Sequence, residues 1–199
     1  MTLLRRHTLV WLSQAPQPDM ADDTSVVDQW HSEGNPFVVC RQRSEAGFVS
    51  LGFCLVSPAH RPRRIAVHAR KDTILHTTRP PALNEVSAAF SNLSIAADRA
   101  GLDIRVYGSW MWQTLTGSPH VNASSDLDLL IEVTDQAVAD RAVEFLERES
   151  GNCPCKIDGE LSFPGAGEVH WREYLQGEPI LLVKSIDATR MLPREDLWK

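Results

Sequence analysis

The chain has 199 residues, 43% of them apolar, and a formal net charge of -6. This length suits one domain or two small ones with a real hydrophobic core, and the acidic balance argues against general nucleic-acid binding. No run approaches the roughly 18 consecutive apolar residues of a membrane span, and the first residues lack the features of a signal peptide. The sequence therefore predicts a globular protein of the cytoplasm, with neither membrane nor nucleic acid as a partner.

The cysteines do not form a recognisable metal or redox motif. The only close pair, Cys153 and Cys155, is spaced Cys-Pro-Cys, whereas zinc and redox sites use Cys-x-x-Cys. We expect these two residues, together with Cys40 and Cys54, to be reduced and to pack inside the protein.

Charge is spread unevenly along the chain. Residues 1–80 carry 10 Lys and Arg against 7 Asp and Glu, a net +3, whereas residues 81–199 carry 10 against 19, a net -9. The basic part gathers at Arg61, Arg63 and Arg64. These arginines suit a patch for phosphates or for an acidic protein, and a solvated arginine surface explains them equally well.

The first 80 residues predict a small β-rich domain. Runs of β-branched and aromatic residues indicate strands, and Ser-Glu-Ala-Gly indicates a hairpin connection. The expected strands are 36–42, 47–57 and 64–70, with a loop at 57–63. Two prolines at 80–81 forbid regular structure, so we place the boundary with a second domain, residues 81–199, at this point.

The second part alternates helices and strands, and the whole is a mixed α/β (α+β) chain. A first helix is capped by Asn84 and ends at Gly101, and a later one is capped by Thr134 or Asp135 and ends at Gly151. Between them we expect the following elements: a strand at 104–108, a helix at 109–115 that ends near Gly117, and a strand at 126–133. Further strands are expected at 155–163, 167–175 and 180–184.

Two aspartates interrupt the aliphatic strand at 126–133. Side chains alternate along a strand, so Asp126 and Asp128 project from one face while Leu127 and Leu129 pack on the other. Adjacent, partly buried carboxylates raise each other's pKa unless a cation lies between them. Mg²⁺ suits such a pair, because it prefers oxygen ligands and completes its shell with water and phosphate; Mn²⁺ shares this preference.

A Gly-Ser pair lies upstream, at the predicted junction of strand and helix. Gly108 would let the backbone approach a phosphate closely, while Ser109 supplies a hydroxyl at a helix N-terminus with free amides. Together with the aspartates, this pair indicates phosphoryl-group transfer. A lone Asp-x-Asp is weak on its own, because an exposed strand edge or a turn also explains it.

The order strand, Gly-Ser, helix, strand with Asp-x-Asp resembles the nucleotidyltransferase (polymerase-beta-like) superfamily. A wider set of segments carries a closer resemblance: RHTLVWL, PFVVCRQ, LGFCLV, GSWMWQTLTG, SDLDLLIEV, IDGEL, VHWREYL, ILLVKS and LPREDLW. Through these segments nearly the whole chain is similar to the phosphoribosyl-dephospho-CoA transferases, in particular to the holo-acyl-carrier-protein synthases of malonate decarboxylase.

The resemblance implies a nucleotidyltransferase-like catalytic domain at 81–199 and a definite reaction. The family transfers phosphoribosyl-dephospho-CoA from triphosphoribosyl-dephospho-CoA to a serine of the acyl carrier protein and releases pyrophosphate. Asp126 and Asp128 would hold the metal, and Gly108 and Ser109 would hold the departing phosphates. Other acceptors, such as a small molecule, an RNA end or the citrate lyase carrier protein, remain alternatives, as does a non-catalytic binding module, which the retained aspartates argue against.

Several assignments stay open. The segment 116–125 is longer than in many superfamily members and is expected to form a loop over the substrate. A third metal carboxylate would be Asp158 or Glu160, with Asp158 favoured, unless Asp158-Gly159 is a hairpin turn with Glu160 in solvent. Lys184, at the end of its strand, either reaches a phosphate or lies on the surface.

Histidine and tryptophan side chains near the predicted site each have two explanations. His120 and His170 could each serve as general base, although a packed or surface histidine is the more common explanation. Three tryptophans could stack on adenine, although core packing explains at least two of them better; they are Trp110, Trp112 and Trp171.

Overall fold

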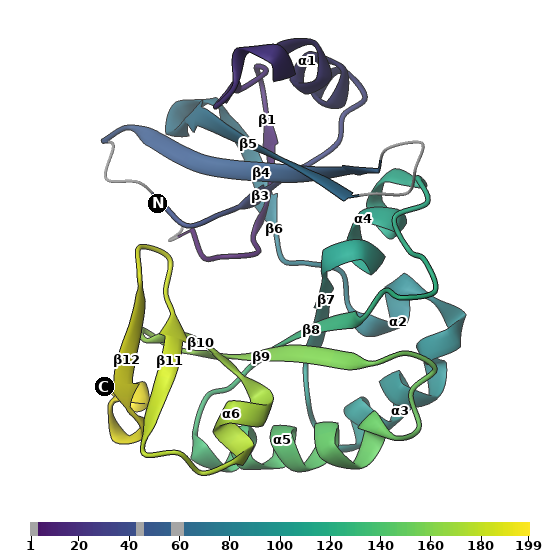
Figure 1. Cartoon of the computed structure of the whole chain (residues 1–199), viewed down its shortest axis with the longest axis vertical. Coiled ribbons are helices and arrows are strands. Elements are labelled where there is room, and N and C mark those ends of the chain that lie inside the picture. Colours follow the sequence, from purple (N-terminus) through teal and green to yellow (C-terminus); the bar gives the residue numbers. More distant parts are fainter. Residues whose placement is uncertain (1–3, 43–45, 57–61) are drawn as a thin grey trace.

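The computed structural model describes residues 4–42, 46–56 and 62–199, which build two six-stranded sheets with six α-helices around them. The protein is therefore α+β, as predicted, and the two sheets lie one above the other in Figure 1. Most of the predicted loop at 57–63, with Arg61, and half of the predicted hairpin connection at 44–47 lie outside the described residues. No helix of the described part is both long and apolar enough to cross a bilayer.

The first sheet is entirely antiparallel, with strand order β2-β5-β4-β3-β1-β6. Its strands are β1 (Leu9–Leu12), β2 (Gln17–Pro18), β3 (Phe37–Val39), β4 (Phe48–Val56), β5 (Pro62–Arg70) and β6 (Ile74–Thr78). The three strands predicted in this region are thus confirmed as β3, β4 and β5. One face carries the core, where Trp30 of helix α1 (Thr24–Ser32) stacks on Phe53 at 4.5 Å between ring centroids.

The second sheet has the order β12-β11-β10-β9-β8-β7. Its strands are β7 (Ile104–Tyr107), β8 (Leu127–Glu132), β9 (Ile157–Phe163), β10 (Gly167–His170), β11 (Ile180–Lys184) and β12 (Thr189–Pro193). Only β8 and β9 pair in parallel, and helix α5 (Gln136–Ser150) makes the crossover between them. Asp135 caps α5 by accepting a hydrogen bond from the amide of Val138, so the second of the two predicted caps is confirmed.

The two faces of this second sheet differ in polarity. Leu127, Leu129 and Ile131 of β8 are fully buried on the face that packs against α5 and α3 (Ser91–Arg99). By strand alternation, Asp128 and its neighbours project from the opposite face. This polar face is the side that looks toward the first sheet in Figure 1.

Two predicted elements differ from the structure. The helix expected from Asn84 to Gly101 is broken at Ser87 into α2 (Leu83–Val86), a 3-10 turn η3 (Ala88–Phe90) and α3, and its N-cap is Ala82. Ser87 is extended, and its hydroxyl accepts a hydrogen bond from Ala89, which starts the second helical segment. The strand expected at 167–175 stops at His170, whose side chain caps the short helix α6 (Trp171–Leu175).

Helix α4 (Gly108–Thr116) joins the two cores. It ends, as predicted, at Gly117, whose φ of 69° suits glycine. Trp112 is 5% exposed and packs edge-on against Trp30 in the core of the first sheet. Trp110 packs edge-on against Phe90 in the core of the second sheet. Trp171 is 2% exposed. Core packing, rather than an open stacking surface, therefore accounts for Trp112 and Trp171.

Candidate active site

The Gly-Ser pair and the aspartates meet where β7 runs into α4. Tyr107, the last residue of β7, is the cross-strand partner of Asp128 on β8, so the next residue, Gly108, lies beside the Asp128 side chain. Gly108 has a φ of 68°, and a Cβ atom at this position would lie 1.9 Å from Asp128 Oδ2. A side chain at this position would therefore displace the carboxylate, and the positive φ also favours glycine.

Three aspartates gather beside this turn. Asp158 of β9 pairs in register with Asp128 in the parallel ladder, and Asp126 lies just before β8. Burial first, and then the charges of Asp158 and Asp126, together raise the pKa of Asp128 to about 6. No described residue donates a hydrogen bond to Asp128, so its negative charge is uncompensated by direct contacts.

Asp126 and Asp158 each keep one carboxylate oxygen without a partner among the described residues. Lys156 Nζ donates to Asp126 Oδ2 at 2.7 Å, whereas Asp158 Oδ1 accepts from the Gly159 amide at 2.9 Å and from His170 Nε2 at 2.7 Å. The remaining oxygens, Asp126 Oδ1 and Asp158 Oδ2, join those of Asp128 as open acceptors. This arrangement suits an oxygen-binding cation.

The hydrogen bonds of His170 fix its tautomer. The backbone amide of Arg172 donates to His170 Nδ1 at 3.2 Å, so Nε2 must carry the proton that it donates to Asp158. Both ring nitrogens are occupied, and His170 orients Asp158 rather than presenting a free base.

The other predicted histidine lies elsewhere. His120 is 7% exposed and lines a groove with Trp30 and Leu55, beyond the C-terminal end of α4. The length of α4 alone, about 12 Å at 1.5 Å per residue, separates that end from Gly108. None of the three aspartates lines this groove.

Glu160 belongs to a different set of contacts. Glu160 follows Asp158 by two residues in β9, so both side chains project from the same face. Glu160 is 5% exposed and accepts hydrogen bonds from Lys184 and His7. Burial opposes its ionisation, but these bonds and the charge of Arg6 outweigh burial and lower the pKa of Glu160 to about 2. The alternative of a hairpin turn with a solvated Glu160 is therefore wrong, and Lys184 is neither free nor simply on the surface.

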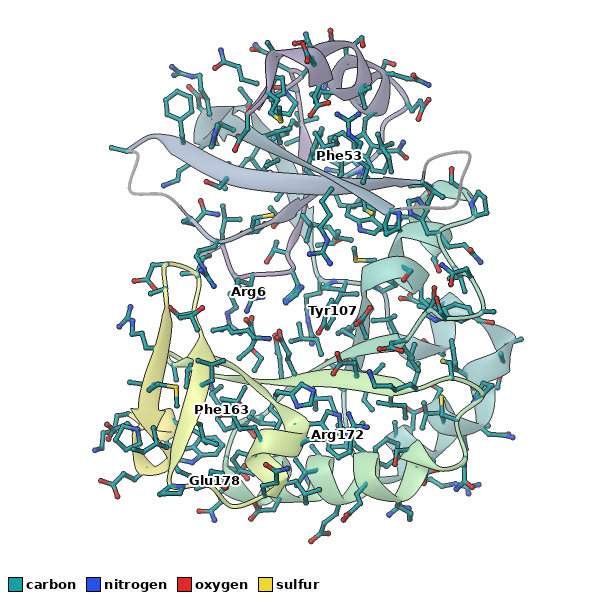
Figure 2. All side chains as sticks on the ribbon, viewed as in Figure 1. Arg6, Phe53, Tyr107, Phe163, Arg172 and Glu178 are labelled. Atoms are coloured by element: carbon teal, nitrogen blue, oxygen red, sulfur yellow. The ribbon has the colours of Figure 1, made fainter. Side chains whose placement is uncertain are left out.

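A basic turn that sequence analysis did not single out covers this region. Arg5 Nη1 lies 3.4 Å from Glu132, Arg6 pairs with Glu168, and His7 Nε2 lies 3.4 Å from Glu160 Oε2. We call residues 5–7 the basic turn. Figure 2 shows Arg6 and Tyr107 between the two sheets. The sequence does show three consecutive basic residues ahead of a strand. Their acidic partners are more than 100 residues away, so the sequence alone did not reveal what these residues contact.

His7, Glu160 and Glu168 form a second group with the geometry for a metal, since their ligand atoms lie within 4.8 Å of one another. Two cations already occupy its carboxylates, because Arg6 pairs with Glu168 and Lys184 pairs with Glu160. A metal would have to displace both. The three aspartates keep open carboxylate oxygens, but these do not all lie within 4.8 Å of one another, so a metal held by all three would require their side chains to move closer together.

The two described arginines of the predicted basic patch point in opposite directions. Arg63 pairs with Asp23 at the start of α1, on the core side of the first sheet. Arg64, its neighbour on β5, projects from the opposite face, and no described residue pairs with it. Arg64 shares this face with Cys54, its cross-strand partner, and with Cys40, whose Sγ lies beside Gly52. Burial raises the pKa of Cys40, and the charges of Arg6 and Arg64 oppose this rise.

Replacing Gly108 with alanine should displace the Asp128 carboxylate, because the new Cβ would overlap it. Gly117→Ala is the matched control, since Gly117 has nearly the same φ, 69°, but nothing within 4 Å of its Cβ position. Each variant should lose about 1–2 kcal/mol of unfolding free energy to the left-handed backbone. Crystal structures should show Asp128 moved in Gly108→Ala alone, and an unmoved carboxylate there would contradict the close approach.

Comparison with known proteins supplies the family. The family model described as the phosphoribosyl-dephospho-CoA transferase MdcG C-terminal domain matches residues 74–195, and the N-terminal domain model matches residues 5–80. No solved structure matches the chain significantly.

Several curated relatives are named phosphoribosyl-dephospho-CoA transferase. A Xanthomonas campestris protein is 35% identical over 97% of this chain and 96% of its own, and a Bradyrhizobium diazoefficiens protein is 34% identical over 95% and 90%. A Pseudomonas aeruginosa protein is 31% identical over 83% and 80%. The chain that places Gly108 against Asp128 thus belongs to the phosphoribosyl-dephospho-CoA transferase family.

Proposed function

We propose that the protein transfers phosphoribosyl-dephospho-CoA from triphosphoribosyl-dephospho-CoA to a serine of the acyl carrier protein of malonate decarboxylase, with release of pyrophosphate. The observation that carries this proposal is the contact of Gly108 with Asp128, which joins a helix N-terminus to a cluster of three carboxylates. A nucleotidyltransferase-like fold for residues 81–199, after a small domain at 1–80, is part of the proposal.

The carboxylates fit Mg²⁺, or Mn²⁺ in its place. Asp126, Asp128 and Asp158 offer only oxygen ligands, which both ions prefer. The pKa of Asp128 is raised by burial first and then by the charges of Asp158 and Asp126, a repulsion that a bound cation would relieve. When bound, the metal would polarise the attacked phosphate and neutralise charge on the leaving pyrophosphate.

The chain's own groups would bind and orient the substrates. The first amides of α4, with the Ser109 hydroxyl, would donate hydrogen bonds to the departing phosphates, because amides at a helix N-terminus lack backbone partners. His170 would keep Asp158 in place through its Nε2 proton. Lys156 would do the same for Asp126.

Two kinds of acceptor are compatible with this site. Malonate decarboxylase follows from the sequence resemblance, and the citrate lyase carrier protein or a small molecule is the second candidate. Both candidates use the same aspartates and the same donor. They differ only in the surface that meets the acceptor, so parallel assays with the two carrier proteins separate them.

The direct test is transfer in a defined mixture. The purified protein, synthetic donor, Mg²⁺ and the malonate decarboxylase carrier protein should yield carrier whose mass has increased by the phosphoribosyl-dephospho-CoA group, together with pyrophosphate. Mass spectrometry of the carrier measures the product. Chelation should stop the reaction, and added Mg²⁺ or Mn²⁺ should restart it. An unmodified carrier, or full transfer after removal of divalent metal, would contradict the proposal.

Variants of the aspartates provide the control for this assay. Asp128→Asn should lower transfer about 100-fold or more, because such a loss of transition-state stabilisation is typical when one electrostatic contact is removed. Asp98→Asn, on the exposed face of α3, should transfer normally.

Arg64 and Arg63 form a matched pair for locating the donor phosphates. Arg64→Gln should raise the donor KM, because it removes an unpaired cation on the side of the basic turn, whereas Arg63→Gln should leave the donor KM unchanged and lower stability through Asp23. Steady-state kinetics with each substrate varied, at low and moderate salt, measures both effects. An increase in the carrier KM alone would assign Arg64 to docking of the acidic carrier.

A further inference from the structure

His7 occupies an unusual backbone position. The amide of Thr8 donates to the Arg5 carbonyl at 3.3 Å, which closes a turn, and His7 within that turn has a φ of 65°. It is the only non-glycine residue with positive φ in the described part of the chain. Glycine is favoured at such a turn position, and asparagine, aspartate and histidine are the other residues enriched there. Such backbone outliers cluster at functional sites, so the position of His7 directs attention to its side chain.

The turn aims the imidazole at the candidate active site. Its ring centroid lies 4.3 Å from that of Tyr107, the cross-strand partner of Asp128. The charge of a protonated His7 would act directly on Asp128, since it opposes the rise in the pKa of that carboxyl. His7 thus belongs to the N-terminal part of the chain, which forms the first sheet, but it lies beside the aspartates of the second sheet.

Glu160 selects the tautomer of His7. Glu160 is an ionised carboxylate that also accepts from Lys184, so it can only accept from His7 Nε2, 3.4 Å away. Nε2 then carries the ring proton, and the lone pair of a neutral His7 is on Nδ1. No described residue hydrogen-bonds to Nδ1, in contrast to His170, whose two nitrogens are both engaged.

We propose that His7 is the general base of the transfer, with Nδ1 accepting the proton of the incoming serine hydroxyl. The serine O–H bond breaks as its oxygen forms a bond to the attacked phosphorus, and the P–O bond to pyrophosphate breaks with its electron pair leaving on pyrophosphate. The proton passes from Nδ1 to solvent afterwards. This inference rests on the proposed function, because it takes a serine hydroxyl as the acceptor.

Chemical rescue tests the assignment. His7→Gly removes the imidazole at a position whose backbone suits glycine, and its kcat for carrier modification should fall about 100-fold or more, as is typical for loss of a general base. Added imidazole should restore at least a tenth of the lost rate. Pyrazole, which has the same ring shape but is a far weaker base, should not.

The controls separate proton transfer from structural support. His7→Asn tolerates the left-handed backbone but fills the site without a base, so its rate should fall as far and should not respond to imidazole. His170→Gly should lose activity through Asp158 and should also fail to respond. Thermal unfolding of each variant shows whether it is folded.

Full activity in folded His7→Asn, or equal rescue by pyrazole and imidazole, would overturn the role of His7 as a base. Either result would leave the proposed function intact, because wild-type transfer is measured in the same experiment. If wild-type protein does not modify the carrier, it is the proposed function that fails.

Discussion

The pairing of the basic turn with the acidic face of the second sheet is the interaction on which the rest of the structure depends. Arg5, Arg6 and His7 each meet a glutamate on a different strand, namely Glu132 on β8, Glu168 on β10 and Glu160 on β9. Glu160 and Glu168 are each 5% exposed, and buried carboxylates are tolerated only when they are paired. Two buried glutamates of the acidic part are therefore paired inside the molecule with residues of the basic part, whereas the Arg5–Glu132 pair is exposed.

This pairing, together with α4, determines where the site lies. Trp112 of α4 is buried in the core of the first sheet, while Gly108 at the start of the same helix lies against Asp128 on the second. The basic turn enters from the other side and brings His7 onto Tyr107. The aspartates consequently lie between the two sheets, where groups from both can reach one substrate.

Local sequence signals predicted the elements that form the centre of the site. Alternation identified β8 and its outward aspartates, and the Gly-Ser pair marked the start of α4, because both patterns depend on residues close together in sequence. The choice between Asp158 and Glu160 could not be made in this way, since both project from the same face of β9. It depends on the register of β9 with β8 and on contacts with His7 and Lys184, which are distant in sequence. The role of the basic turn is likewise non-local, and the break at Ser87 arises from a side-chain bond that apolar spacing does not reveal.

A double-mutant cycle between Arg6 and Glu168 tests the central pairing most directly. Methionine at either position removes one charge but keeps an unbranched side chain. Arg6→Met leaves Glu168 buried without its main partner, whereas Glu168→Met leaves Arg6, 20% exposed, with Glu160 at 3.8 Å. We expect Arg6→Met to lower the free energy of unfolding by about 3 kcal/mol and Glu168→Met to lower it by less, and we expect the double variant to cost much less than the sum, because breaking a buried pair is more costly than replacing it. Urea unfolding of the four proteins measures this coupling. Strictly additive effects would contradict the claim that the basic turn holds the two parts of the site together.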